Sequence, residues 1–387
     1  MKTFQVFYIG LIKSGGANAY VALRLIQPIC IMYTHVYIGL DAHTRNCVLG
    51  AIDADANVVS VHDFPTSETG LIRHVKALPA TFKYLALEES SLAGWIAGVL
   101  TPHVTELIVC DPVQNALISR GGSKDDVRDS LKLARLLRLE ELKPVYHNHD
   151  PSRVDFKMVA QQYLSITNEI VALKNQIKSK YYQGGVLKIS GSLVYRKAHR
   201  HSYLKHVESE AMKKVILNFY DPLDCMVRVR ENALLLMQEL GKKYGEIEQF
   251  QRIPGIGVVG AHVFSAFIQT PHRFATKQQL WKYCQLGIRV RQSGGKKLSG
   301  ECLDRSGASV LKAISYQCWM SSLPAKESNE VSLFYHASAK RTQDLTRARL
   351  NTQRNVLATL WTIWRKNVDY HPHLFYRPPV SARKAKQ

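Results

Sequence analysis

Acidic residues at the ends of apolar segments constrain the fold of this chain more than any other sequence feature. Asp41 follows the apolar run 36–40, and Glu88 follows the apolar run 84–87. Asp126 and Asp129 stand three residues apart at the start of a segment with helical periodicity, so they share one helix face. Strand ends and a first helical turn can bring such side chains together at one edge of a sheet.

Four carboxylates in a small space repel one another, and the repulsion raises some of their pKa values. Mg²⁺ or Mn²⁺ ions, which prefer carboxylate and phosphate oxygens, relieve the repulsion and create a site that can cut phosphodiesters. The alternative is that acids in a first helical turn cap the helix. Ser123 with Asp126 three residues later resembles such a capping box.

The charge balance predicts a polyanionic partner. The 387 residues include 52 Lys and Arg but 31 Asp and Glu, which gives a net charge of +21. Because the basic residues are spread over globular sequence, nucleic acid is favoured over a membrane surface. The alternative is a soluble protein that is merely basic.

The seven cysteines show no CxxC pair and no zinc-like spacing, which argues for a reducing compartment and against structural zinc. The leader, residues 1–35, has two apolar stretches, the second interrupted by Arg24 and Pro28. Neither is a clean span of about 18 apolar residues. We interpret 1–35 as lying outside the fold, with a signal anchor as the alternative, and expect no membrane association.

Periodicity predicts an α/β domain over residues 36–145. Apolar runs separated by polar turns indicate strands, and spacings of three and four indicate helices. The expected strands are 36–40, 47–52, 58–64, 82–87 and 106–110, and the expected helices are 66–78, 91–100 and 124–142. The order is β-β-β-α-β-α-β-α, with the first three strands as an antiparallel meander.

That order, with its acids, resembles the ribonuclease-H fold of RuvC-like nucleases and transposases. The segments Gly39-Leu-Asp-Ala-His, Leu87-Glu-Glu-Ser, Asp111-Pro and Lys124-Asp-Asp-Val-Arg-Asp-Ser-Leu-Lys-Leu-Ala resemble the DEDD motifs of the bacterial insertion-sequence 110 family of transposases, including its 1111 subgroup. The family pattern Lys-Thr-Asp-x-x-Asp-Ala matches Asp126 and Asp129, with Asp125 in place of Thr and Ser130 in place of Ala. Alignment to the family pattern of apolar-Glu-small-small favours Glu88 over Glu89 as the single glutamate of the motif.

Helical periodicity in the middle of the chain predicts a coiled-coil connector over residues 156–250. Two long segments with helical periodicity, 156–177 and 215–250, flank a basic insertion, 178–206. The insertion holds seven Lys or Arg and no acid, interleaved with Tyr181, Tyr182, Tyr195 and Tyr203. It is either a nucleic-acid contact, through phosphates and base stacking, or a solvated basic loop.

Residues 251–370 form the expected C-terminal domain, followed by a basic tail, 371–387. Pro254-Gly-Ile-Gly-Val-Val-Gly-Ala resembles a helix-hairpin-helix, in which Gly255 and Gly257 let backbone N–H groups approach a phosphate. An ordinary glycine-rich turn is equally compatible. A single helix is expected over about 327–368.

A second block carries the same resemblance. Residues 286–300, with Gln-Ser-Gly-Gly-Lys at 292–296, are similar to the family segment that bears a serine nucleophile, which would be Ser293. Ser299 and Ser306 are rivals, because Leu303-Asp-Arg-Ser departs from the family's Ile-Ser-Lys. The residues expected to hold nucleic acid are Lys124, Arg289, Arg291, Lys296 and Lys297, together with Gly255 and Gly257.

The resemblance implies a DNA transposase or serine recombinase in the bacterial cytoplasm, at the nucleoid. Asp41, Glu88, Asp126 and Asp129 would hold Mg²⁺ or Mn²⁺, and Ser293 would form a phosphoserine link to DNA. The implied partners are donor and target DNA, a noncoding bridge RNA and further copies of the chain, as a dimer or tetramer. The alternatives are a RuvC-like nuclease of branched DNA and an inactive nucleic-acid-binding copy.

Overall fold

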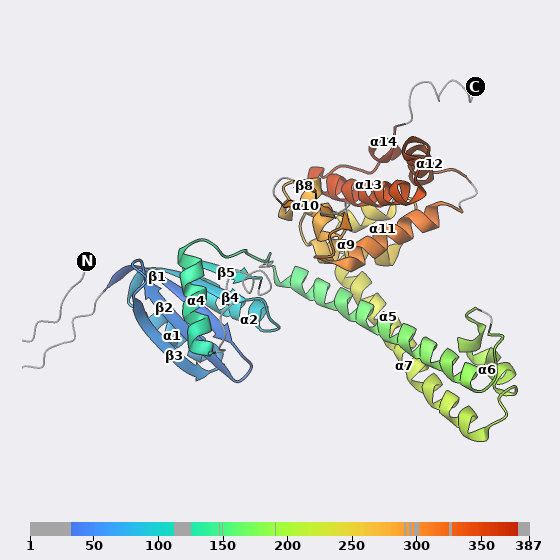
Figure 1. Cartoon of the computed structure of the whole chain (residues 1–387), viewed down its shortest axis with the longest axis horizontal. Coiled ribbons are helices and arrows are strands. Elements are labelled where there is room, and N and C mark those ends of the chain that lie inside the picture. The colour runs from blue at the N-terminus through green and yellow to red at the C-terminus, as the bar shows by residue number, and fades with distance from the viewer. Residues whose placement is uncertain are drawn as a thin grey trace, which may run out of the picture. The chain divides into compact units, whose positions relative to one another are not determined.

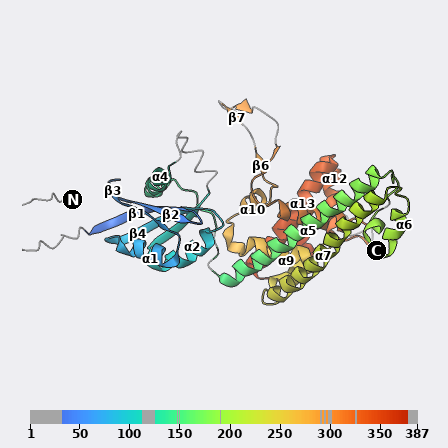
Figure 2. The same cartoon turned by 90° about the horizontal axis from the view of Figure 1, so that it is seen from below.

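The chain divides into two compact units, Met1–His147 and Asn148–Gln387 (Figures 1 and 2). The computed structural model describes residues 32–111, 125–146, 148, 150–189, 191–289, 302–324 and 327–377, and the backbone alone at 292–293 and 296–297. Lys124, Arg291 and Ser299 therefore lie outside the described residues. Within the described part, no helix is both long and apolar enough to cross a membrane.

The first unit is built on a five-stranded mixed sheet with the order β3-β2-β1-β4-β5. Antiparallel pairing joins β1 to β2 and β2 to β3, and parallel pairing joins β4 to β1 and to β5. The strands are β1 (Tyr33–Ala42), β2 (Asn46–Asp53), β3 (Val58–Pro65), β4 (Ala80–Glu88) and β5 (Glu106–Cys110). The antiparallel meander and the element order expected from periodicity are confirmed.

Helices cover both faces of this sheet (Figure 1). On one face, α1 (Glu68–Ala77) and α2 (Ala93–Leu100) bury the alternating residues Val36, Ile38 and Leu40 of β1. On the other, α4 (Asp126–Arg138) packs through Leu133, Leu136 and Leu137. Side chains of a strand alternate between faces, so Gly39 and Asp41 lie on the face that α4 covers.

A pair of glycines lets α4 approach the sheet closely. Gly39 and Gly50 are direct partners across β1 and β2. A Cβ at Gly39 would lie 1.9 Å from the Ser130 carbonyl oxygen, and one at Gly50 would lie 2.7 Å from the Ser130 hydroxyl. The fully buried Ser130 donates its hydroxyl to the Val127 carbonyl within α4 (2.9 Å). The helix backbone therefore rests directly on the sheet backbone at this point.

Two boundaries of the first unit differ from the sequence prediction. β1 begins at Tyr33, where Tyr33 pairs with Ala80 and His35 with Phe82, so residues 33–35 belong to the sheet and not to the leader. The helix expected over 124–142 is shorter, because Asp125 is its N-cap and Glu140 has φ 58°, which helix geometry does not allow.

The second unit begins with an antiparallel helix pair, α5 (Pro151–Gln183) and α7 (Glu210–Gly241). Phe156 and Ala160 of α5 share a core with Met237 of α7, whereas Tyr181 lies beside Tyr220. The outer end of the pair carries α6 (Lys197–Leu204) and the segments beside it (Figures 1 and 2). The second predicted helix, 215–250, is wrong as a single helix, because α7 ends at Gly241 and α8 (Glu246–Gln251) starts anew.

The rest of the second unit is a helical body. Its core draws on α5, on α7 and on the helices α8, α9 (Val258–Ile268), α10 (Lys277–Tyr283), α11 (Ser309–Ser322), α12 (Glu330–Thr342), α13 (Leu345–Lys366) and α14 (Pro372–Phe375). The single helix expected over 327–368 is two helices. Gln343 adopts a left-handed φ of 53°, and Asp344 then caps α13 by accepting from Thr346 N and Arg347 N.

We expect Gly39→Ala to loosen the first unit. The added methyl group would overlap the α4 backbone, and overpacking of this kind costs about 1–3 kcal/mol. Gly98→Ala in α2 is the matched control, because nothing lies within 4 Å of its Cβ, and it should stabilise by roughly 0.4–1 kcal/mol. Hydrogen exchange of peptides from β1 and α4 measures both; equal protection in the two variants would contradict the close approach.

Candidate active site

Three potential metal ligands converge where β1 ends. One ligand atom each from Asp41, His43 and Asp126 lies within 4.8 Å of the others, and His43 Nε2 is 3.5 Å from Asp41 Oδ2. Asp41 and Asp126 are partly buried, and His43 is exposed. Strand alternation explains the first pair, because residues 41 and 43 are two apart and point the same way.

The N-terminal cap of α4 positions the helical aspartates. Asp125 is the capping residue: its carboxylate accepts from Val127 N (3.2 Å) and lies 3.8 Å from Arg128 Nε, whereas Ser123 lies outside the described residues. The capping-box alternative is therefore wrong for Asp126, whose carboxylate faces Asp41 instead. Asp and Thr are both good N-cap residues. Asp125 therefore caps α4 at the position where the motif pattern has threonine.

Burial and like charges raise the pKa of Asp41 above its ordinary value. Desolvation is the largest cause, the facing carboxylates of Asp126 and Asp129 add to it, and His43 opposes it. Asp129 lies one turn after Asp126 on the same face of α4 and is also partly buried. The site thus holds its anions close together at an energetic cost that a cation would remove.

Glu88 ends β4 beside Asp41. Leu40 pairs with Leu87 in parallel register, so the two acids follow paired residues at the carboxyl ends of adjacent strands. Ala86 belongs to the core beneath α4, whereas Leu85 and Leu87 face α1 and α2. Alternation therefore places Glu88 on the face of Asp41 and Asp126, but its ligand atoms are not part of the close three-residue group.

The donor set fits a divalent cation. Ligand oxygens on one Mg²⁺ lie about 2.1 Å from the ion, so ligand atoms within 4.8 Å of one another need only small movements to share it. Carboxylate oxygens suit Mg²⁺ or Mn²⁺, and an imidazole suits Mn²⁺ better than Mg²⁺. His43 was overlooked as a ligand in the sequence, although its spacing of two from Asp41 at a strand end was a usable signal.

Ser293 lies in a small hairpin of the second unit. β7 (Gln292–Ser293) pairs antiparallel with β8 (Lys296–Lys297), so Ser293 is opposite Lys296 and Gln292 is opposite Lys297. A second ladder joins β6 (Ile288–Arg289) to β9 (Cys302–Leu303). The strands place Ser293 and both lysines within one short segment, with the exposed Arg289 on the neighbouring ladder.

The rival Ser306 is engaged in a local turn. Its hydroxyl donates to Asp304 Oδ1 (2.7 Å), and its backbone N–H donates to the same oxygen (2.9 Å). These hydrogen bonds lower the pKa of Asp304. Ser306 thus has a structural explanation.

The two glycines of the helix-hairpin-helix candidate have different surroundings. Gly255 has φ +87°, and a Cβ there would lie 2.3 Å from the Cys318 carbonyl oxygen of α11, so packing explains it. Gly257 begins α9 without a side-chain cap, and nothing lies within 4 Å of its Cβ position. Open backbone of this kind suits a phosphate contact at Gly257 better than at Gly255.

Two family models match the chain. One, described as "Transposase" and representing the DEDD transposases of IS110 type, covers residues 38–181, and the other, described as "Transposase IS116/IS110/IS902 family", covers residues 247–336. No curated protein matches the sequence. The first match contains the acids at β1, β4 and α4, and the second contains the Ser293 hairpin. The chain therefore belongs to the insertion-sequence 110 family of transposases, enzymes that cut and rejoin DNA.

Proposed function

We propose that the chain is a metal-dependent serine recombinase that moves its insertion sequence between DNA sites. The observation that carries the proposal is the convergence of Asp41, His43 and Asp126 at the end of the central strand. The strand order β3-β2-β1-β4-β5, with acids at the ends of β1 and β4, supports a ribonuclease-H-like assignment for the first unit.

Asp41, Asp126, Asp129 and Glu88 would hold Mg²⁺ or Mn²⁺, with His43 as a further ligand. The bound cation would polarise the scissile phosphate and offset its negative charge. These carboxylates lie on three elements, the ends of β1 and β4 and the capped start of α4. The alternative function, a nuclease that uses water as its nucleophile, would need the same metal.

Ser293 would be the nucleophile on DNA. Its Oγ would form a bond to the scissile phosphorus while the bond from phosphorus to the DNA 3′-oxygen breaks, which releases a 3′-hydroxyl. A 3′-hydroxyl would later attack the phosphoserine and free Ser293. Lys296, whose backbone pairs with that of Ser293, and Arg289 would hold the phosphate and its developing charge.

The resemblance to the family implies the partners. Donor and target DNA are the substrates, and a noncoding bridge RNA would choose them by base pairing. The antiparallel pair α5 and α7 would act as a coiled-coil connector between copies of the chain, as a dimer or tetramer, with exposed apolar residues on α7 such as Leu217, Leu235 and Leu236. The enzyme would work in the bacterial cytoplasm, at the nucleoid.

We expect Asp126→Asn to weaken Mn²⁺ binding and to slow DNA cleavage about 100-fold or more, the usual cost of one lost electrostatic contact at developing charge. Asp125→Asn is the matched control, because Asn caps a helix as well as Asp does. Calorimetric titration with Mn²⁺ and a cleavage assay measure the two effects. Similar losses in both variants would assign the effect to the loss of a negative charge at the start of α4 and not to metal ligation by Asp126.

Mg²⁺ should stabilise the first unit more at neutral than at acidic pH. The raised pKa means that folded Asp41 keeps its proton to higher pH than unfolded Asp41, so without metal this group's contribution to stability falls as pH rises from 3.8 through the raised pKa. The cation needs the ionised form, so its stabilising effect grows over the same window. Thermal unfolding with Mg²⁺ and with EDTA, at pH 5 and pH 8, measures this.

Asp41→Asn serves as the control for that pH dependence. The variant cannot titrate at this position, so the metal-induced shift in Tm should become smaller and less dependent on pH. An unchanged profile would show that other groups control metal binding.

Ser293→Ala should abolish both recombination and the covalent protein–DNA adduct, because the nucleophilic oxygen is removed. Ser306→Ala should retain both, since its hydroxyl serves a turn. Denaturing gels detect the adduct, and PCR across new junctions detects recombination from a plasmid that carries the native flanking DNA. Metal-dependent cutting that survives in Ser293→Ala without any adduct would instead establish the water-using nuclease.

A further inference from the structure

The outer end of the helix pair is a folded basic module that the proposed chemistry does not use. We define the arm tip as residues 178–209. Its segment 178–206 contains seven Lys or Arg and three His but no acidic residue. Within it, Leu193–Tyr195 and α6 form helical turns between the ends of α5 and α7 (Figure 1). The description as a solvated loop is therefore wrong for this segment.

A buried tyrosine network holds the arm tip together. Tyr181 and Tyr220 are almost completely buried, with their hydroxyl oxygens 3.0 Å apart, and Tyr220 donates to the Val194 carbonyl (2.7 Å). Tyr203 packs edge-on against Tyr181. Burial raises the pKa of Tyr181 and of Tyr220, so both stay neutral. Tyr181 and Tyr203 are therefore structural, and the expectation that Tyr181 stacks on bases is wrong.

An ion pair adds a second anchor. Arg200 makes two hydrogen bonds to the Asp224 carboxylate, at 2.8 and 2.5 Å, and its guanidinium lies 4.0 Å from the centre of the Tyr220 ring. Lys197 also lies 3.4 Å from Asp224. Two of the seven basic residues, Arg200 and Lys197, are therefore paired with Asp224.

The five remaining cations are free of carboxylate partners. Among the described residues, no carboxylate lies within ion-pair distance of the basic groups at Lys178, Lys180, Lys188, Arg196 and Lys205. Lys188 and Lys205 are both exposed and belong to different segments of the arm tip. A rigid core thus presents uncompensated positive charge to solvent.

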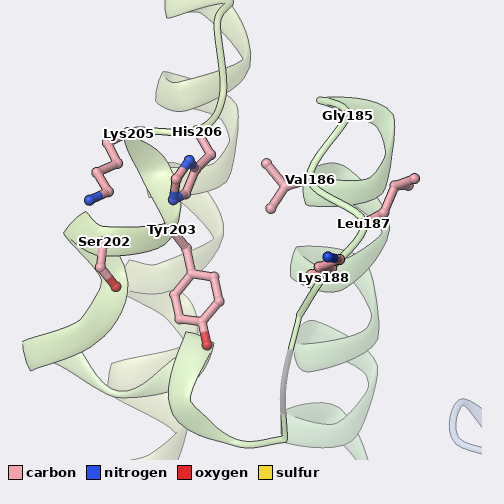
Figure 3. Close-up of a pocket in the computed structure, with 8 residues that line it drawn as sticks. All are labelled: Gly185, Val186, Leu187, Lys188, Ser202, Tyr203, Lys205 and His206. Atoms are coloured by element: carbon pink, nitrogen blue, oxygen red, sulfur yellow. The ribbon is translucent and has the colours of Figure 1, made fainter.

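An open pocket of about 730 Å³ lies between those segments. One wall is the chain that leaves α5, Gly185–Lys188, and the other is the end of α6 with Ser202, Tyr203, Lys205 and His206 (Figure 3). His206 and Tyr203 project into the space between the walls in Figure 3. The lining has two lysines, a histidine and two hydroxyl groups, which are donors suited to phosphate oxygens.

Exposed apolar groups lie at the end of α5 and in the chain that leaves it. Leu187 is 75% exposed and Tyr182 is 43% exposed, and the Lys178 ammonium lies 5.7 Å from the centre of the Tyr182 ring. Of the four tyrosines in the basic segment, Tyr182 is the exposed one, whereas Tyr181 is buried and Tyr195 and Tyr203 are partly buried. Phosphate donors beside an exposed ring are the combination that single-stranded nucleic acid recognition uses.

We propose that the arm tip is a second nucleic-acid site, in which Lys188 and Lys205 hold the sugar–phosphate backbone of a strand and Tyr182 and Leu187 contact its sugars or bases. The ligand chemistry is a phosphodiester strand, of RNA or of DNA. The proposal depends on the proposed function only for the presence of these nucleic acids. It requires neither the metal nor Ser293.

Binding of labelled single strands to the full-length protein tests the proposal. Lys188→Gln with Lys205→Gln should reduce the slope of log affinity against log salt by about 1.4, because each lost single-strand phosphate contact contributes about 0.7. Arg73→Gln with Lys76→Gln is the control of equal charge, on exposed positions of α1 in the other unit. Fluorescence anisotropy with a 30-nucleotide RNA and with the matching DNA gives both slopes.

The result for each strand decides the ligand. Loss with RNA alone assigns the arm tip to the guide, loss with DNA alone assigns it to the substrate, and loss with both assigns it to the shared backbone. Equal slopes in the tip variant and the α1 control would overturn the proposal. Circular dichroism at equal concentrations shows whether the tip variant keeps its helices.

A crosslink gives a local readout that folding defects cannot imitate. The photoreactive residue p-benzoylphenylalanine at Leu187 should crosslink to the bound strand, whereas the same residue at Leu235, 65% exposed on α7, should not. Crosslinking at Leu187 to another copy of the chain and not to nucleic acid would make the tip a protein interface and overturn the proposal. DNA recombination that continues while the Leu187 crosslink is absent would separate this failure from failure of the proposed function.

Discussion

The close approach of α4 to the strand pair β1 and β2 is the contact on which the candidate site depends. Side chains on both surfaces usually keep the backbone of a helix away from the backbone of the sheet that it covers. Here Gly39 and Gly50 remove the side chains from the sheet, and the buried Ser130 is small enough to enter the space. The first turn of α4 therefore comes down to the level of Asp41, and carboxylates 85 residues apart in sequence can face one another.

This contact also explains why the acids tolerate one another without a cation. The free N–H groups at the start of α4 give that end a partial positive charge, which favours anions in the first turn. The Asp125 carboxylate accepts a hydrogen bond from Val127 N. Asp126 and Asp129 therefore need not cap the helix and remain available to the candidate site. Burial first, and then the neighbouring carboxylates, still raise the pKa of Asp41, and a bound cation would favour its ionised form.

The strands and helices of the first unit were predictable because each follows a simple period. Apolar alternation and spacings of three and four residues located β1 to β5, and with them the strand ends that carry Asp41 and Glu88. The motif pattern favoured Glu88 over Glu89; the register of β4 with β1, which a single sequence does not contain, puts Glu88 on the same sheet face as Asp41. The breaks at residues 242–245 and at Gln343 were missed, although Gly241 and Gly245 lie at the two ends of the first and Asp344, a good N-cap residue, follows the second.

The basic segment of the arm shows what composition alone cannot separate. Its four tyrosines look equivalent in the sequence, as aromatic residues among lysines. In the fold, Tyr181 is buried, Tyr195 donates to the Lys174 carbonyl, Tyr203 packs on Tyr181, and Tyr182 stays exposed. The cations sort in the same way, since Arg200 and Lys197 neutralise Asp224 while Lys188 and Lys205 face solvent. A folded core is therefore what converts a basic composition into a surface with defined positions for phosphate.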